Sequence, residues 1–154
     1  ELLRYVAGVR KVDGARKRME ALLERFRMSE YADNLIESYS HGMRQRLAFC
    51  AALLGEPALF ITDEPMVGLD VQGHRDVKRL FREIAAEVRS VMMTTHTLSV
   101  AEEVADRIAV VDHGRLVALG TLDELRSGSK LEAANLEDLF LELTAENALA
   151  GAEG

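Results

Sequence analysis

Residues 57–64 read Pro57-Ala-Leu-Phe-Ile-Thr-Asp-Glu64. The residues between the proline and the aspartate form a short, continuous apolar run, which is typical of a strand buried on both faces of a parallel sheet. A similar run, Ser90-Val-Met-Met-Thr94, follows after a segment with helical spacing over Val71–Val88. Strand, helix and strand in this order predict a βαβ unit with two parallel strands.

The region before this unit is predicted to be helical. Apolar residues recur at helical spacing in two segments, with Asp13 as the expected N-cap of the second. Residues 28–41 collect polar residues and glycine, which predicts a loop. A third helix is expected from about Gly42 to Leu54, where Pro57 prevents its continuation.

The region after the second strand is predicted to contain a hairpin and two helices. Two apolar runs, 108–111 and 116–119, flank an Asp-His-Gly turn, which predicts the hairpin. Thr121-Leu-Asp-Glu124 is a capping box that opens a short helix. An amphipathic helix is expected over 135–146. The architecture is therefore α/β, with a helical subdomain in front of the sheet.

The composition is that of a soluble globular chain and argues against a nucleic-acid partner. Hydrophobic residues make up 48%, and 19 Lys and Arg against 26 Asp and Glu give a net charge of −7. An acidic chain without tryptophan is poorly equipped to track a phosphate backbone or to stack bases. The single Cys50 excludes a disulfide within the chain and fits a reducing, cytoplasmic setting. The uncharged apolar stretch 47–55 is about half of what a membrane span requires.

Polar residues follow both predicted strands at the point where each ends. Asp63 and Glu64 come after the first strand, and Thr95 and His96 after the second. Because ligands of parallel sheets bind beyond the carboxyl ends of the strands, these side chains are candidates for one shared site. One carboxylate could hold a divalent cation while the other faces a water. An isolated Asp-Glu pair, however, is more often a capped or salt-bridged loop.

A second candidate site lies at the start of the third helix, in Tyr39-Ser-His-Gly-Met-Arg-Gln-Arg46. The N–H groups of a first helical turn and the helix dipole attract anions. Ser40 could donate a hydroxyl, and Gly42 would let the backbone approach an anion closely. A serine at this position, taken alone, is more often a plain N-cap than part of an anion site.

Four motifs in register resemble those of one family, the ABC-type ATPases. Ser40-His-Gly-Met-Arg-Gln-Arg46 resembles the signature loop, usually written LSGGQ, and Leu59-Phe-Ile-Thr-Asp-Glu-Pro65 resembles the Walker B strand. Gly68-Leu-Asp70 is similar to the D-loop, and His96 to the switch histidine. The order and spacing agree with the family across residues 1–126.

The resemblance implies a role for the residues at the ends of the strands. Asp63 would hold Mg²⁺ through water, since Mg²⁺ keeps several of its waters. Glu64 would act as general base on the attacking water, and His96 would contact that water and the γ-phosphate. Catalysis would then consist of positioning and electrostatic stabilisation.

The resemblance also implies that the signature loop and the D-loop of this chain act on a second copy of the domain. Ser40 and Gly42, in the loop that also contains His41 and Met43, would clasp the γ-phosphate of an ATP bound to that copy. Asp70 would help to join the two copies. His41 stands where the family usually has glycine, and Met43 where it usually has glutamine; exporter-like bacterial members share such variants.

The fold class implied is α/β, with a helical subdomain followed by a partial P-loop (RecA-like) parallel-sheet core and a C-terminal hairpin and helix. We expect a signature-bearing helical subdomain over 1–54, the C-terminal part of the ATPase core over 55–127, and a C-terminal helix and tail over 128–154. No Gly-Lys pair occurs in the sequence, so the Walker A consensus is missing. We therefore expect this C-terminal part of the domain to bind ATP weakly or not at all by itself.

The function implied is that of an exporter-like ATPase subunit that powers an ABC transporter. Its cofactors would be ATP and Mg²⁺, and its partners a second nucleotide-binding subunit and a transmembrane permease at the inner face of the cell membrane. Two alternatives remain open. One is a catalytically silent module that pairs with a complete ABC subunit, and the other is a soluble ABC ATPase without a transport role.

Overall fold

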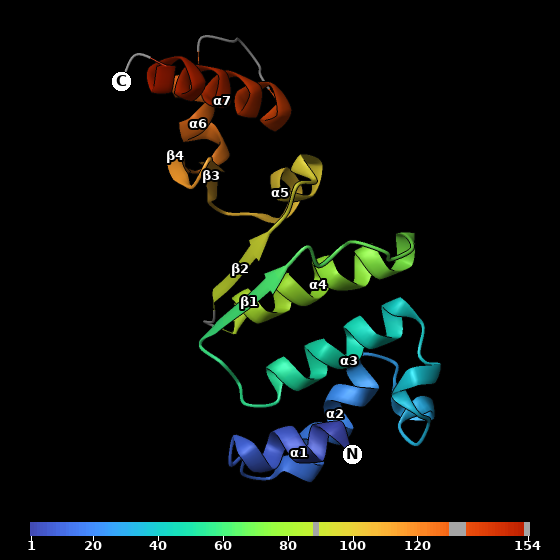
Figure 1. Cartoon of the computed structure of the whole chain (residues 1–154). Coiled ribbons are helices and arrows are strands. Elements are labelled where there is room, and N and C mark those ends of the chain that lie inside the picture. Colours follow the sequence, from blue (N-terminus) through green and yellow to red (C-terminus); the bar gives the residue numbers. More distant parts are fainter. Residues whose placement is uncertain (88–89, 130–134, 153–154) are drawn as a thin grey trace. The chain divides into compact units, whose positions relative to one another are not determined.

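The computed structural model describes residues 1–87, 90–129 and 135–152, and for 146–152 the backbone alone (Figure 1). The chain divides into two compact units, Glu1–Thr94 and Thr95–Gly154. The three-part division predicted from the sequence, with boundaries after residues 54 and 127, stays a prediction.

The first unit begins with the three predicted helices. They are α1 (Leu2–Val9), α2 (Ala15–Arg25) and α3 (His41–Leu53), and the stretch predicted as a loop contains the short 3-10 helices η1 (Ser29–Tyr31) and η2 (Ile36–Ser38). The expectation that Asp13 caps α2 is wrong. Gly14 occupies the N-cap position with a φ of 63°, which glycine adopts without steric cost.

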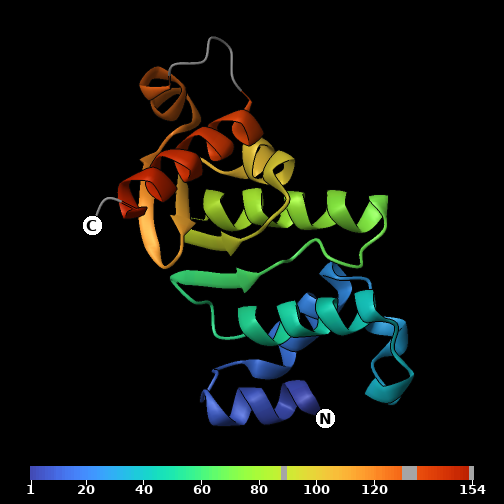
Figure 2. The same ribbon diagram turned by 45° about the horizontal axis from the view of Figure 1, so that its top comes forward.

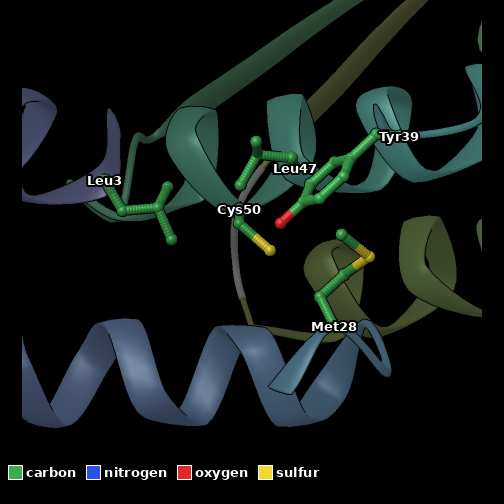
Figure 3. Close-up of a cluster of buried hydrophobic side chains, with 5 residues drawn as sticks. All are labelled: Leu3, Met28, Tyr39, Leu47 and Cys50. Carbon is green, nitrogen blue, oxygen red and sulfur yellow. The ribbon is translucent and has the colours of Figure 1, made fainter. Parts of the chain in front are cut away.

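These helices pack around a buried cluster that consists of Leu3, Met28, Tyr39, Leu47 and Cys50 (Figure 3). The Tyr39 hydroxyl donates a hydrogen bond of 2.6 Å to the carbonyl oxygen of Tyr31, so its polar atom is satisfied. Burial raises the pKa of the Cys50 thiol to about 12. The thiol therefore stays protonated near neutral pH and behaves as a small apolar side chain.

A pair of parallel strands completes the first unit. Strands β1 (Leu59–Asp63) and β2 (Ser90–Thr94) are joined through helix α4 (Val71–Ala86), which confirms the predicted βαβ order. The register pairs Leu59 with Ser90 and Asp63 with Thr94. Both strands therefore end at the same edge of the sheet, where the sequence predicts the polar residues.

The burial of β1 differs from the expectation. Phe60 is 2% exposed, but its neighbours Leu59 and Ile61 are 48% and 63% exposed, and Met92 of β2 is 55% exposed. Successive side chains of a strand point to opposite faces, so one face of this pair is packed and the other is open. The predicted burial on both faces is wrong for these strands, because α4 packs on the pair from one face.

A series of phenylalanine rings connects the helices of the first unit to β1. The ring of Phe49 in α3 lies 6.0 Å from Phe26, which ends α2, and 5.9 Å from Phe60 in β1. Phe60 in turn lies 6.3 Å from Phe81 in α4. In Figure 2, helix α3 runs beside β1 and helix α4 beside β2, the strand with which α4 has most of its contacts in the sheet. This packing fixes the helix that starts at residue 41 relative to the strand that ends at Asp63.

The second unit contains the predicted hairpin and the helices around it. Its elements are α5 (Leu98–Val104), β3 (Ile108–Asp112), β4 (Arg115–Gly120), α6 (Leu122–Gly128) and α7 (Leu136–Ala152). Strands β3 and β4 are antiparallel, as predicted. The capping box is confirmed: Thr121 Oγ1 accepts from Glu124 N, and the Glu124 carboxylate accepts from Thr121 N. Ile108, Val110 and Leu136 form the buried centre of this unit.

Candidate active site: the strand end and the helix start of the first unit

The acidic residues lie at the carboxyl end of β1, next to the end of β2. Asp63 is the last residue of β1 and is exposed, and the Thr94 hydroxyl donates a hydrogen bond to its carboxylate. Glu64 leaves the strand with a φ of 44°, and its backbone N–H donates to Thr94 O at 3.0 Å. This turn separates the two acids, because Asp63 continues the strand while Glu64 begins the following loop. The two carboxylates can thus serve different roles, as the sequence suggests.

The donor set at Asp63 fits a hydrated magnesium ion. Mg²⁺ commonly takes one or two carboxylates, keeps several waters and binds phosphate oxygens of its substrate. Asp63 supplies one accessible carboxylate, and the hydrogen bond from Thr94 orients it. Within residues 1–87, 90–129 and 135–152, no three His, Cys, Asp or Glu side chains gather into a group that could hold a metal ion.

The second candidate site is the start of α3, where Ser40 is the N-cap. Its backbone is extended, and its Oγ accepts a hydrogen bond of 3.2 Å from Met43 N. Ser40 and His41 are exposed, and Gly42 and Met43 are half-buried. The capping role of Ser40 is therefore present, and its accessible hydroxyl lies beside the positive end of a helix of 13 residues. Both interpretations of Ser40 from the sequence are compatible with this geometry.

The segment after Glu64 is held against α3. Gln45 Nε2 donates a hydrogen bond of 2.5 Å to the carbonyl oxygen of Pro65, which is buried. The His41 ring lies over Gly68, and Gly42 faces Leu69 so closely that a Cβ at Gly42 would lie 3.4 Å from Leu69 Cδ2. The predicted signature loop and the predicted D-loop are therefore in contact within one unit.

Asp70 connects this segment to the next helix. It is the N-cap of α4, and its Oδ1 accepts a hydrogen bond of 2.7 Å from Gly73 N. Asp70 is also exposed, so one carboxylate oxygen caps the helix while the side chain stays accessible. His74, one turn into α4, contacts the carbonyl oxygen of Met66 through Nε2 at 3.0 Å.

His96 belongs to the second unit. It is exposed and follows Thr95, whose hydroxyl accepts a hydrogen bond of 3.0 Å from Thr97 N at the start of α5. Asp63 and Glu64 at the end of β1 and the helix start at Ser40 all belong to the first unit. A common site of His96 with Asp63 and Glu64 stays a prediction.

Sequence reasoning missed two residues that hold the site together. Thr94 was not singled out, although the parallel register that pairs it with Asp63 would have identified it. Gln45 was not singled out either, although it lies one helical turn after His41 and therefore on the same face of α3. The Gln45 Oε1 atom is buried and has no hydrogen-bond partner among the described residues.

Comparison with known proteins relates the chain to transporter subunits. The profile of the family described as "ABC transporter" matches residues 4–67. The chain is 38% identical over 142 residues to the daunorubicin/doxorubicin resistance ATP-binding protein DrrA of Streptomyces peucetius, a match that covers 91% of this chain and 43% of that protein. It is 39% identical over 132 residues to the ABC-type transporter ATP-binding protein EcsA of Bacillus subtilis (strain 168), covering 86% and 53%.

A solved structure supports the same relationship. The structure described as an ATP-binding subunit of an ABC transporter matches with a TM-score of 0.85 and 33% identity, over 92% of this chain and 60% of that one. The chain spans about half the length of the curated relatives it matches. None of the helices in the described ranges has the length and apolar composition needed to cross a membrane.

Proposed function

Since this chain belongs to the ABC transporter family of ATP-binding proteins, we propose that it forms the part of an ATPase domain that handles the attacking water and closes over a second copy's nucleotide. The observation that carries this proposal is the end of β1. Asp63 is accessible there and is oriented by Thr94 at the end of the neighbouring strand β2. Glu64 follows it and begins the next loop, with its N–H bonded to Thr94 O. A P-loop supplied by sequence outside these 154 residues would complete the nucleotide site.

The acidic strand end supports the chemistry of phosphoryl transfer. Asp63 would hold Mg²⁺, which when bound neutralises charge on the phosphates. Glu64 would orient the attacking water and accept its proton, and its position outside the strand leaves it half-buried beside Asp63. His96 would contact the γ-phosphate and the same water from the second unit.

The start of α3 supports recognition of a phosphate group from a second copy. Ser40, with the backbone of His41, Gly42 and Met43, would contact the γ-phosphate of the ATP held by that copy. Asp70 would contribute to the interface between the two copies. The exposed position of Ser40 and Asp70 on one unit supports this role.

The partners would be those of an exporter. DrrA is described as a resistance protein for daunorubicin and doxorubicin, and EcsA as an ABC-type transporter protein. We propose by analogy that this chain acts with a second nucleotide-binding subunit and a membrane permease, at the inner face of the cell membrane. ATP-driven closure of the two copies would then move the permease.

The test uses a chimera of DrrA from Streptomyces peucetius in which this chain replaces the matched segment of 142 residues. We expect the chimera to hydrolyse ATP and Glu64→Gln to abolish turnover while ATP still binds, because the amide keeps the packing but cannot accept the proton. Glu124→Gln, in the capping box of α6, is the matched control and should leave turnover unchanged. Normal turnover of the Glu64 variant, or an equal loss of binding and turnover, would contradict the assignment.

A further inference from the structure

Two side chains one helical turn apart hold the segment between the acidic strand end and α4. His41 and Gln45 are four residues apart and therefore share a face of α3. Gln45 holds the beginning of the segment through its hydrogen bond to Pro65 O, at 2.5 Å. His41 contacts the segment three residues further on, at Gly68. Helix α3 thus contacts the segment between the end of β1 and α4 at two separate points, of which only Gly68 lies in the predicted D-loop.

The contact between His41 and Gly68 is close enough to restrict both residues. A Cβ placed on Gly68 would lie 2.7 Å from His41 Cδ2 and 3.1 Å from His41 Nε2. Real Cβ atoms do not approach other heavy atoms to 2.7 Å, so the imidazole occupies the space that any side chain at residue 68 would need. Gly68 also has a φ of 73°, which favours glycine for a separate reason. The conformation of the loop and the position of the ring are therefore fitted to each other.

Other contacts hold the same segment from the side of α4. His74 Nε2 lies 3.0 Å from Met66 O, and Asp70 caps the helix through Gly73 N. The segment is thus fixed to α4 at both ends of its turn. The His41 side chain is the part of the signature loop that contacts this segment at Gly68, and His41 is exposed. Its loss should therefore alter the loop without opening the buried core.

We infer that His41 is a positioning residue: its imidazole ring lies over Gly68 and sets the position of the Gly68–Asp70 segment relative to Ser40. The inference rests on the proposed function, in which Ser40 and Asp70 both serve the second copy. His41 contributes its backbone to the helix start and its side chain to the neighbouring loop. Ser40 and Asp70, which would both contact the second copy, then keep a fixed separation, because the His41 ring packs between the helix start and the Gly68–Asp70 segment.

The test is made on the chain of 154 residues without nucleotide, so that it does not depend on ATP binding. In His41→Ala, the ring over Gly68 is gone, and the NMR signals of the Gly68 Hα protons should lose their ring-current shift. The urea midpoint of the first unit should stay close to that of the parent. His113→Ala is the matched control, since His113 is an exposed histidine in the hairpin turn of the second unit. It should leave the Gly68 signals unchanged.

A rescue experiment separates positioning from a general contribution to stability. Gly68→Ala should lower the folding equilibrium constant in the parent through both the strained φ and the clash with the ring. In the His41→Ala background only the backbone strain remains. Gly68→Ala should therefore lower the folding equilibrium constant there by a factor at least about threefold smaller than in the parent. An equal cost in both backgrounds, or unshifted Gly68 signals in His41→Ala, would overturn the inference.

The link to function is tested in the DrrA chimera that carries Glu64→Gln. Gly68→Ala should reduce ATP-dependent pairing of two copies, and adding His41→Ala should restore part of it. Normal pairing of the Gly68 variant would overturn the positioning role. If the Glu64→Gln chimera with an unchanged Gly68 does not pair, the proposed function fails instead. The measurements on the chain of 154 residues still test the contact between His41 and Gly68.

Discussion

Replacing Phe49 with alanine is expected to destabilise the packing of α3 against β1. Phe49 is 5% exposed and lies between Phe26 and Phe60, with ring centroids at 6.0 and 5.9 Å. Replacing a buried phenylalanine with alanine costs about 3–5 kcal/mol, because apolar contacts are lost and a cavity remains. Each of the two ring pairs accounts for about 0.5–1.5 kcal/mol beyond the buried area. Small domains are stable by only about 5–15 kcal/mol, so Phe49→Ala should remove a large share.

Tyrosine fluorescence reports this loss for the first unit alone. The chain has no tryptophan, and its three tyrosines, Tyr5, Tyr31 and Tyr39, all lie in the first unit. Urea unfolding followed by this signal should give a much lower midpoint for Phe49→Ala, and Phe49→Leu should lose less because it leaves a smaller cavity. Leu35→Ala is the matched control, since Leu35 is 75% exposed and should change stability by less than about 0.5 kcal/mol. A loss below about 1 kcal/mol for Phe49→Ala would refute the role of the rings.

Three further results are expected from single sites. Thr121→Ala should destabilise α6 by about 1 kcal/mol through loss of the capping box, seen as faster amide exchange in the second unit, with no change in the tyrosine signal. Cys50 should resist alkylation at pH 8 until urea unfolds the chain. Because burial raises its pKa from 9.0 to about 12, the unfolded state releases the thiol proton first, and urea midpoints should fall as the pH rises above about 9. Ser40→Arg should block ATP-dependent pairing of the DrrA chimera in light scattering while the tyrosine unfolding curve shows a folded first unit; pairing that persists would contradict the role of Ser40.

The order of elements follows from local sequence signals. The apolar run before Asp63 and the run that ends at Thr94 give two strands, and their helix connection gives the parallel pairing that the structure contains. Ser40 and Thr121 cap helices where the sequence places them, because a hydroxyl before an amphipathic run satisfies the first amides whatever the tertiary context.

What the sequence could not provide depends on contacts between distant residues. The apolar residues of β1 predict burial on both faces, yet the exposure of Leu59 and Ile61 depends on which elements cover the sheet. The ring of His41 over Gly68 joins residues that are far apart in the chain. The sequence shows that residue 41 departs from the family pattern. Only the fold shows that Gly68 is the residue that His41 contacts.

In the proposed function, the acidic strand end of one copy and the helix start of another act on the same triphosphate. The most direct measurement is a crystal structure of the Glu64→Gln chimera with bound ATP and Mg²⁺. We expect Mg²⁺ beside Asp63 and the γ-phosphate between residue 64 of one copy and Ser40 and Gly42 of the other. A structure in which Mg²⁺ lies away from Asp63, or in which the γ-phosphate does not contact Ser40, would contradict this arrangement.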